Sequence, residues 1–544
     1  MVIAPFVSWQ NWAGNGLELP FNISVWMAAS LTIFFSLLLA LQKTTFTLPR
    51  PAWPFILAPL ILFIATFLTG HSQSSTLFFR ELYVLGGIAF FFALFQHKMG
   101  RGTVDQLLLW CAILMTLHAL VGVLQIYLPS SLAGLYGTLD DRMPRGAFQQ
   151  INIHASYLAT GLLVLFYCLS RPVTRNASRL VRVLIVLYAF TGTLVVLQSG
   201  SRVALLSLVV GLVFLALRHR YFAANKKLVG IVLLATLVGG ALGAEGLARS
   251  AHKMQTESEG IDSSIRLSMY SVVLELIAQK PILGHGFGEF RQAWNTQVSD
   301  FLHRNPQAQL PAKIVHPHNE LMYLMIEGGL LTISGLLLAA FFVLRQLTKL
   351  GLRQAGGYTA LLVPVVLHTQ VELPLYQSAA HWMWLCLFVY VIMRHSSRVV
   401  LLAPSQASLI VSHVGATLLF LGAVYFLVHS AISQRAVMAF ARTTDASLLQ
   451  PALSNHYFSE IAVTSAMRVK LHKGIATNDH NAVAQFLEWV PAQIESTRDL
   501  RLYEDKIAAY SFLKDKDGIC GVVAEGLKQY PQYDKFQFAA KQCP

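Results

Sequence analysis

The stretch QLLLWCAILMTLHALVGVLQIYL, residues 106–128, holds no Lys, Arg, Asp or Glu over 23 positions. A helix needs roughly 20 predominantly apolar residues to cross about 30 Å of hydrocarbon, so the stretch predicts a transmembrane helix. Comparable apolar runs occupy residues 22–42, 53–70, 79–96, 151–170, 181–198, 201–217, 228–246, 320–344, 357–374, 376–393 and 408–430. We therefore expect an all-α, polytopic membrane protein with about twelve transmembrane helices.

The composition of the chain agrees with this expectation. Of its 544 residues, 55% are hydrophobic and 12% are charged, whereas soluble domains carry about 25% charged residues. The balance excludes an ordinary soluble enzyme. The first 21 residues hold no Lys or Arg, so the first apolar run is interpreted as a retained span and not as a cleaved signal peptide.

The cations in the short loops predict the orientation, because Lys and Arg favour the cytoplasmic side. The loops after the first, third, fifth and seventh runs carry twelve cations: Lys43, Arg50, Lys98, Arg101, Arg171, Arg175, Arg179, Arg182, Arg218, Arg220, Lys226 and Lys227. The loops after the second, fourth and sixth runs carry four: Arg80, Arg142, Arg145 and Arg202. The bias places three parts of the chain on the outer side of the membrane. They are the N-terminus, residues 247–319 (the long loop) and residues 431–544 (the C-terminal tail). Much of the net charge of +14 is thus topology signal, and no nucleic-acid partner is needed to explain it.

Two domains are expected: a membrane domain over residues 1–430, which includes the long loop, and a soluble tail. Segments 481–496 and 502–515 place apolar residues at helical spacing among charges, which predicts stacked amphipathic helices. A tetratricopeptide-like repeat is one form of such a domain, although the segments are too short to establish a repeat.

The cysteines follow the same division of the chain. Cys111, Cys168 and Cys386 lie in predicted spans, whereas Cys520 and Cys543 lie in the tail. Since the predicted topology puts the tail in an oxidising compartment, we expect a disulfide between the last two. Two free thiols in a reducing compartment are the alternative, which unchanged gel mobility on reduction would favour.

The sequence HPHNE at 316–320 joins the long loop to an apolar run. Imidazole exchanges protons near neutral pH, so His316 or His318, beside Asn319 and Glu320, could deprotonate or orient an acceptor hydroxyl. A helix-capping cluster is an equally good interpretation. Metal ligation by His-x-His with a nearby carboxylate is a weaker one, because no second cluster with ligand spacing follows.

Two arginines stand at predicted membrane boundaries. Arg202 ends the run QSGSR between two spans, and Arg266 lies in SSIRLSMYSVVLELI, on an expected helix of the long loop. Guanidinium groups suit phosphate oxygens through paired donors. An interfacial arginine that snorkels to water is the alternative for Arg202.

Polar residues also gather in RGAFQQINIHA (145–155) and LHTQVELPLYQSAAHW (367–382). Their amide, imidazole and carboxylate groups can bind sugar hydroxyls or phosphate, and they can equally bridge helices. The candidates for substrate binding are Arg145, Gln150, Asn152, His316, Asn319, Glu320, His368 and Glu372. The charge bias puts these segments, HPHNE and Arg202 on the same side of the membrane.

Several of these segments resemble those of a known family. SGSR (199–202), RLSMY with Arg266, KPILGHGFGEF (280–290) and HPHNELMYLMIEGGLL (316–331) are similar, in order and spacing, to the signature segments of the O-antigen ligase and polymerase superfamily. Within it, QQINIHASYLA (149–159) and the tail most resemble bacterial protein O-oligosaccharyltransferases of the PglL type.

The resemblance implies a fold similar to other polyprenyl-dependent, GT-C-like glycosyltransferases. It also implies transfer of a preassembled glycan from undecaprenyl pyrophosphate to Ser or Thr hydroxyls of periplasmic proteins such as pilins, in the bacterial inner membrane. His318 would assist the acceptor hydroxyl, and Arg202 and Arg266 would hold the pyrophosphate. Gln150 and Asn152 match a polar pair of the protein-directed branch, although Ile151 replaces the usual proline between them.

The resemblance implies no metal and no other cofactor. The implied partners are the lipid-linked oligosaccharide, an acceptor protein and the surrounding membrane lipid. A ligase for lipid A core, a polymerase that lengthens the glycan, and a membrane transporter remain the alternatives. A transporter would place ionisable groups near the bilayer midplane and show internal symmetry, and neither is evident here.

Overall fold

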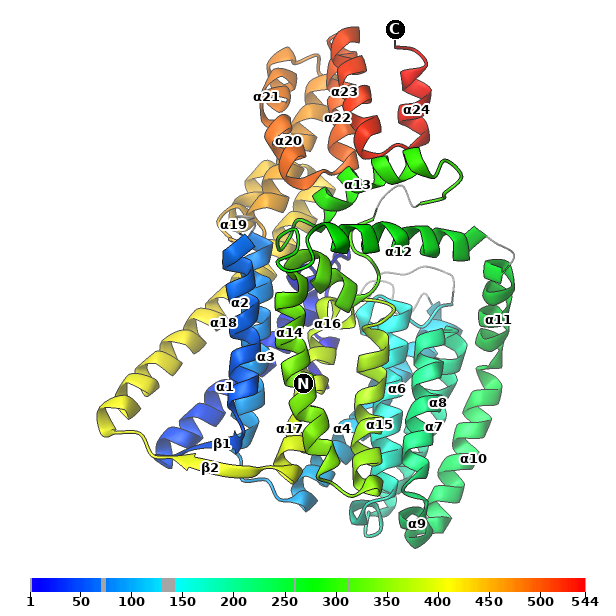
Figure 1. Cartoon of the computed structure of the whole chain (residues 1–544), viewed down its shortest axis with the longest axis vertical. Coiled ribbons are helices and arrows are strands. Elements are labelled where there is room, and N and C mark those ends of the chain that lie inside the picture. The colour runs from blue at the N-terminus through cyan, green and yellow to red at the C-terminus, as the bar shows by residue number, and fades with distance from the viewer. Residues whose placement is uncertain (1, 70–74, 130–141, 259–260, 311–313, 544) are drawn as a thin grey trace. The chain divides into compact units, whose positions relative to one another are not determined.

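The computed structural model describes residues 2–69, 75–129, 142–258, 261–310 and 314–543 (Figure 1). The described part is nearly all helical, which confirms the expected all-α fold. The chain divides into two compact units. The bundle unit comprises residues 1–59, 81–254 and 336–435, and the loop–tail unit comprises residues 60–80, 255–335 and 436–544.

Each of the twelve apolar runs corresponds to one helix. These helices are α1 (Pro20–Gln42), α2 (Trp53–Thr69), α3 (Ser75–Phe95), α4 (Arg101–Tyr127), α6 (Ile151–Leu169), α7 (Arg179–Ser199), α8 (Arg202–Ala216), α10 (Lys226–Leu242), α14 (Glu320–Thr348), α15 (Leu352–His368), α17 (Ala379–Ser396) and α18 (Gln406–Thr443). Seven helical stretches in the described part are long and apolar enough to cross a membrane, and α2 and α8 are shorter apolar helices.

The other helices are short or lie outside the apolar runs. They are α9 (His219–Phe222), α11 (Ala244–Ser258), α12 (Ile261–Gln279), α13 (Phe290–Arg304), α16 (Pro374–Gln377), α19 (Gln450–Leu453), α20 (Ser459–Ala476), α21 (His480–Thr497), α22 (Leu500–Phe512), α23 (Lys516–Gln529) and α24 (Asp534–Ala540). Single 3-10 turns occur at Ala4–Phe6, Gly16–Glu18, Gly146–Phe148, Pro172–Thr174, Ala223–Asn225 and Ala446–Leu449.

Helix α6 is the centre of the bundle unit. Every residue from Ile153 to Leu169 is buried, because α4, α7, α8 and α15 all pack against this helix. A helix that is apolar on all sides suits such a position. The first turn of α6 therefore brings Gln150 and Asn152 to the end of a fully enclosed helix.

A two-stranded antiparallel sheet also belongs to the bundle unit. Strand β1 (Phe46–Arg50) pairs with β2 (Arg398–Leu402), and Phe46 lies opposite Leu402. The sheet joins the α1–α2 link to the α17–α18 link. The sequence analysis did not predict it.

The C-terminal tail is a stack of antiparallel helices, in which α20 to α24 pack in order (Figure 1). Their buried faces share one apolar core that includes Phe486, Tyr503 and Phe536. The expected amphipathic segments 481–496 and 502–515 correspond to α21 and α22. The structure also joins Cys520 to Cys543, whose Cα atoms lie 5.6 Å apart.

The turns of this stack repeat one local pattern: a residue with positive φ is followed by an aspartate. The pairs are Thr444–Asp445, Asn478–Asp479, Arg498–Asp499 and Lys514–Asp515. Each aspartate side chain accepts a hydrogen bond from a backbone N–H two or three residues later. A left-handed residue ends one helix and an aspartate N-cap starts the next.

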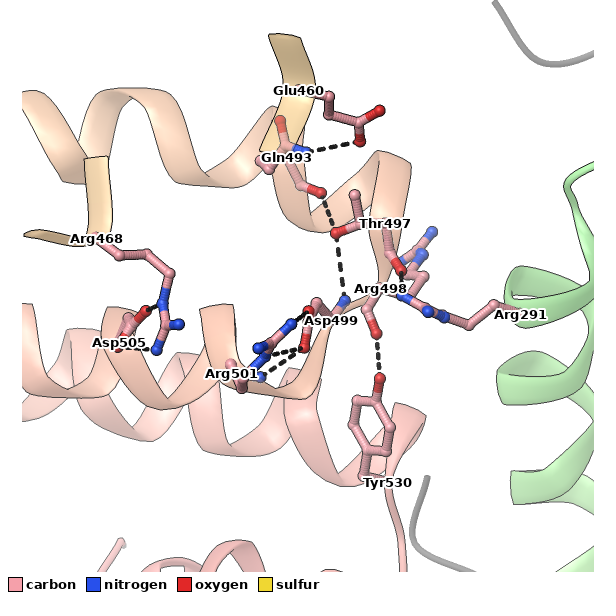
Figure 2. Close-up of polar contacts among 10 residues, drawn as sticks. All are labelled: Arg291, Glu460, Arg468, Gln493, Thr497, Arg498, Asp499, Arg501, Asp505 and Tyr530. Carbon is pink, nitrogen blue, oxygen red and sulfur yellow. Dashed lines mark hydrogen bonds and ion pairs between the residues drawn. The ribbon is translucent and has the colours of Figure 1, made fainter. Parts of the chain in front are cut away.

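The long loop is largely helical and packs against the tail within the loop–tail unit. Helix α13 contacts α23, and the Arg291 guanidinium donates to the Thr497 carbonyl over 2.8 Å (Figure 2). The Gln532 side chain donates to the Ala308 carbonyl over 2.7 Å and accepts from the Leu310 N–H over 3.0 Å. The tail therefore secures both α13 and the chain that follows it.

Candidate functional site

The HPHNE segment forms a turn that leads into α14. The Asn319 side chain accepts a hydrogen bond from the Met322 N–H over 3.0 Å, so Asn319 caps the helix, and Glu320 is its first residue. The role of Asn319 is therefore that of a helix cap, as one of the interpretations of HPHNE expects. It leaves the two histidines to be explained.

His318 has an unusual backbone and an exposed side chain. Its φ of +50° lies in the left-handed region, which few residues other than glycine adopt, although His, Asn and Asp are enriched there. The His318 N–H donates to Nδ1 of His316 over 3.3 Å, and the two rings lie 4.3 Å apart. His316 thus braces the turn from one side and Asn319 from the other, and the His318 ring points into solvent-accessible space.

The glycine-rich segment 280–290 packs against a break in α14. At Gly329 φ is +62° and the helix is interrupted. The N–H groups of Leu330 and Leu331 donate instead to the carbonyls of Pro281 and Ile282, over 2.8 and 3.1 Å. The loop backbone therefore completes the hydrogen bonding that the broken helix cannot supply.

The approach of these two backbones leaves no room for a side chain. A Cβ atom at Gly284, whose φ is +72°, would lie 2.5 Å from the Glu327 carbonyl carbon. A Cβ atom at Gly329 would lie 2.3 Å from the Ile282 carbonyl oxygen. This is the physical reason for glycine in both KPILGHGFGEF and MIEGGLL.

Glu327 anchors the same junction through a buried charge. Its carboxylate accepts from Arg80 over 2.7 Å and from the Gly288 N–H over 3.1 Å, and its side chain is fully buried. The Arg80 guanidinium also lies over the Tyr323 ring, 4.9 Å from its centroid. The sequence analysis missed this pair. A glutamate inside an apolar run was the available signal, because a charge at that depth is costly without a partner.

The predicted phosphate-binding arginines belong to different units. Arg266 is exposed on α12, in the loop–tail unit with His318. Arg202 is half-buried and is the first residue of α8 in the bundle unit, not part of a free turn. Arg145 directly precedes the 3-10 turn Gly146–Phe148 in that same unit and is also half-buried.

Glu372 is the centre of a second cluster, which lies within the bundle unit. Its carboxylate accepts from the Gln150 and Asn152 side-chain amides over 3.0 and 2.7 Å. Nε2 of His368 lies 3.2 Å from the same carboxylate. Gln150 also accepts from the Ile153 N–H over 2.6 Å and so caps α6. Gln150 and Asn152 therefore orient a carboxylate that remains 18% exposed.

The cluster continues into the bundle as a chain of alternating imidazole and hydroxyl groups. His368 Nδ1 lies 2.7 Å from Oγ of Ser156, which lies 3.0 Å from Nε2 of His381. Nδ1 of His381 lies 3.0 Å from Oγ of Ser378. One direction of donation can satisfy this chain of contacts, with each hydroxyl and one N–H of each imidazole donating toward Glu372. The cluster is thus an interhelical polar network that ends in a partly exposed carboxylate.

No group of three or more His, Cys, Asp or Glu side chains within the described ranges could hold a metal ion.

Comparison with known proteins gives two family matches. Residues 187–338 match the O-antigen ligase family, a range that contains Arg202, Arg266 and the HPHNE turn. Residues 358–543 match the C-terminal region of virulence-factor membrane-bound polymerases, a range that contains Glu372 and the tail. No curated protein matches the chain significantly. Together, the two matches and the helical membrane fold support placing the chain in the superfamily of O-antigen ligases and polymerases, whose members carry out glycosyl transfer.

Proposed function

We propose that the chain is an oligosaccharyltransferase of the bacterial inner membrane that moves a glycan en bloc from undecaprenyl pyrophosphate to Ser or Thr hydroxyls of periplasmic proteins, such as pilins. The His318 turn is the observation that carries the proposal. An exposed imidazole is held at positive φ by a neighbour on each side, and strained backbone of this kind clusters at functional sites.

In the proposed reaction the acceptor oxygen attacks the anomeric carbon of the first sugar. The hydroxyl proton passes to the His318 ring, and the bond from that carbon to the pyrophosphate oxygen breaks with both electrons leaving on the phosphate. Arg202 and Arg266 bind the pyrophosphate and stabilise its growing charge. Since this leaving group is already good, the main task of the protein is to position the reactants.

The attachment of the tail favours a protein acceptor. Arg291 and Gln532 join the tail to the long loop in the unit that holds His318. A soluble helical stack in that position suits recognition of a folded or extended polypeptide outside the membrane. Under this proposal Glu372, held by Gln150 and Asn152, binds sugar hydroxyls or amide N–H groups of the glycan, because a carboxylate is purely an acceptor.

The first test is glycosylation of a co-expressed pilin by His318→Ala and by His303→Ala. His303 is an exposed histidine on α13 whose Nδ1 lies 2.8 Å from the Ser299 carbonyl within its own helix, so it is a matched control. Intact-protein mass spectrometry should find the glycan with the control and none with His318→Ala at equal membrane abundance. Normal glycosylation by His318→Ala would overturn the assignment.

Arg266→Lys tests the phosphate contact separately. A lysine keeps the charge but loses the paired donors, so transfer should fall strongly if Arg266 binds pyrophosphate in bidentate fashion. Arg501→Lys, on α22, controls for loss of a guanidinium in the same unit, because exposed Arg501 pairs with Asp499 at the start of its own helix over 2.8 Å. Equal transfer by the two variants would remove Arg266 from the site.

The second candidate function is ligation of O-antigen to lipid A core or polymerisation of the glycan, which the two family descriptions favour. Glycan on lipopolysaccharide and none on pilin would support the ligase, and longer lipid-linked chains would support the polymerase. A transporter would be supported by substrate uptake that survives His318→Ala, with no transfer by the unaltered chain.

A further inference from the structure

A cavity of about 720 Å³ lies in the bundle unit between the first turns of α7 and α10, and no residue of the Glu372 cluster lines it. Four cationic residues line it: Arg179 and Arg182 from α7, and Lys226 and Lys227 from α10. All four side chains are exposed. Positive charge at a helix N-terminus opposes the helix dipole, so this arrangement is unfavourable unless an anion offsets it.

The described part of the chain supplies no such anion. No Asp or Glu occurs between Arg142 and Glu245. Within the described ranges none of the four cations forms an ion pair, and Arg182 donates only to the Arg175 carbonyl, over 3.2 Å. Two other cations of the predicted inner loops differ from these four. Arg171 pairs with Asp105 over 2.8 Å, and Arg218 is buried in the protein.

The packing of α7 and α10 explains why the cavity opens at this end. Farther along the pair, a Cβ atom at Gly239 would lie 2.2 Å from the Phe190 carbonyl oxygen, and one at Gly243 would lie 2.4 Å from the Leu194 carbonyl oxygen. Small residues let the two backbones touch there. Around Arg179 and Lys226 long side chains replace glycine, and a cavity lies between the two helices.

Farther along the two helices from the cations, the cavity wall is apolar. Val183, Val186, Leu228 and Ile231 line it, and exposed Leu187 and Leu234 continue the apolar surface along the two helices. A ligand that matches this surface carries negative charge at one end and hydrocarbon at the other. Basic pockets between transmembrane helices bind the headgroups of anionic lipids in this way.

We propose that the α7–α10 cavity binds an anionic glycerophospholipid, with its phosphate among the four cations and an acyl chain along the apolar wall. Neither Arg202 nor Arg266, the residues proposed to bind the donor, lines this cavity. Through this site, the stability of the bundle unit would depend on the anionic lipid content of the membrane.

The test compares the purified full chain in nanodiscs of phosphatidylcholine alone and with phosphatidylglycerol. Native mass spectrometry should find phosphatidylglycerol retained by the unaltered chain, and the lipid should raise its thermal unfolding midpoint. Arg182→Gln with Lys227→Gln should weaken retention roughly 30-fold, at about fivefold for each cation near an anionic lipid. Arg345→Gln with Lys349→Gln removes the same charge at the end of α14 and should retain the lipid.

A second variant keeps every charge and closes the cavity. Val186→Trp should abolish retention while the midpoint in phosphatidylcholine stays close to that of the unaltered chain. Soluble glycerol 3-phosphate and inorganic phosphate should not replace the lipid, because they lack the acyl chain. Equal loss of lipid in the cavity and control pairs, full retention by Val186→Trp, or equal stabilisation by free phosphate would each overturn the proposal.

Discussion

At the scale of single residues, the HPHNE turn assigns different tasks to two histidines that the sequence pattern treats alike. His316 accepts the His318 N–H through Nδ1, so its ring acts as part of the backbone turn. The His318 ring remains exposed. We infer that His316 is a positioning residue. Substitutions that keep a hydrogen-bond acceptor at this position should preserve transfer activity, and substitutions that remove it should lower the activity.

His316→Asn should retain most of the transfer activity, because an asparagine oxygen accepts an N–H two residues later in the same kind of turn. His316→Ala loses the acceptor and should lower kcat about tenfold, in line with the loss of one hydrogen bond of ordinary strength. The measurement is the rate of pilin glycosylation with each variant. Equal rates for the two variants would show that the bond to His316 does not position His318.

The Glu372 cluster supports a second residue-scale prediction. Gln150→Ala and Asn152→Ala should each slow transfer about 10- to 100-fold, because hydrogen bonds to a charged group contribute roughly 1.5–3 kcal/mol. In a Glu372→Gln background the same changes should cost far less, since both amides act through the carboxylate. Fully additive effects would instead favour direct contact of the amides with substrate.

The residue scale also marks a limit of sequence analysis. The sequence indicated His318, Asn319 and the polar segment around Glu372, because chemistry-bearing residues stand out in apolar surroundings. It could not indicate that Arg80 pairs with Glu327, since 247 positions separate them. Nor could it assign Gln150 to a carboxylate 222 positions away. Local pattern identifies unusual residues, and only the tertiary fold identifies their partners.

At the scale of elements, the contact of α7 with α10 depends on glycine at some positions and not at others. Gly239→Ala places a Cβ atom against the Phe190 carbonyl and should destabilise the bundle unit by about 1–3 kcal/mol. Gly230→Ala, on the same helix, meets open space and should be neutral or slightly stabilising. Thermal unfolding in detergent measures both, and equal midpoints would contradict the close approach.

A pH-dependent contact joins α12 to α13. The Arg304 guanidinium donates to both oxygens of Glu275, over 3.1 and 2.6 Å. This bond, together with one from Gln297, holds the pKa of the Glu275 carboxyl below its ordinary value of 4.5. A depressed folded-state pKa adds stability that is fully present above the unfolded value and is lost as the pH falls through the folded one.

The unaltered chain should therefore lose its advantage over Glu275→Gln as the pH falls below 4.5, the ordinary value for that carboxyl. The two unfolding midpoints should converge in acid and separate toward neutral pH. Because the variant lacks only this titrating group, the difference isolates its contribution from all other carboxylates. A difference that stays constant with pH would mean that the ion pair does not stabilise the α12–α13 contact.

A helix could be predicted from the sequence where its own residues form a long apolar run. All twelve apolar runs became helices, because hydrophobic length is a local property. The strand pair β1–β2 was not predicted, since its two strands lie about 350 residues apart and each has only five residues. The interruption of α14 was also missed, because the carbonyls of Pro281 and Ile282 compensate it from another segment.

At the scale of the whole molecule, the tail and the long loop share one compact unit although about 200 residues separate their centres in sequence. Gln532 makes two hydrogen bonds to the loop backbone, in the segment that leads toward the HPHNE turn. The tail restrains the segment that precedes His318, so loosening the tail should also affect chemistry at His318.

Gln532→Ala removes both bonds and should increase protease cleavage within residues 305–310 and lower pilin glycosylation severalfold, with unchanged membrane abundance. Gln537→Ala is the matched control, because this side chain donates only to the Pro531 carbonyl within the tail, over 2.8 Å. Gln532→Glu keeps the acceptor for the Leu310 N–H and should fall between the two. If Gln532→Ala loosens the loop and leaves transfer intact, the tail serves acceptor binding alone; if neither changes, the attachment of tail to loop has no bearing on the reaction.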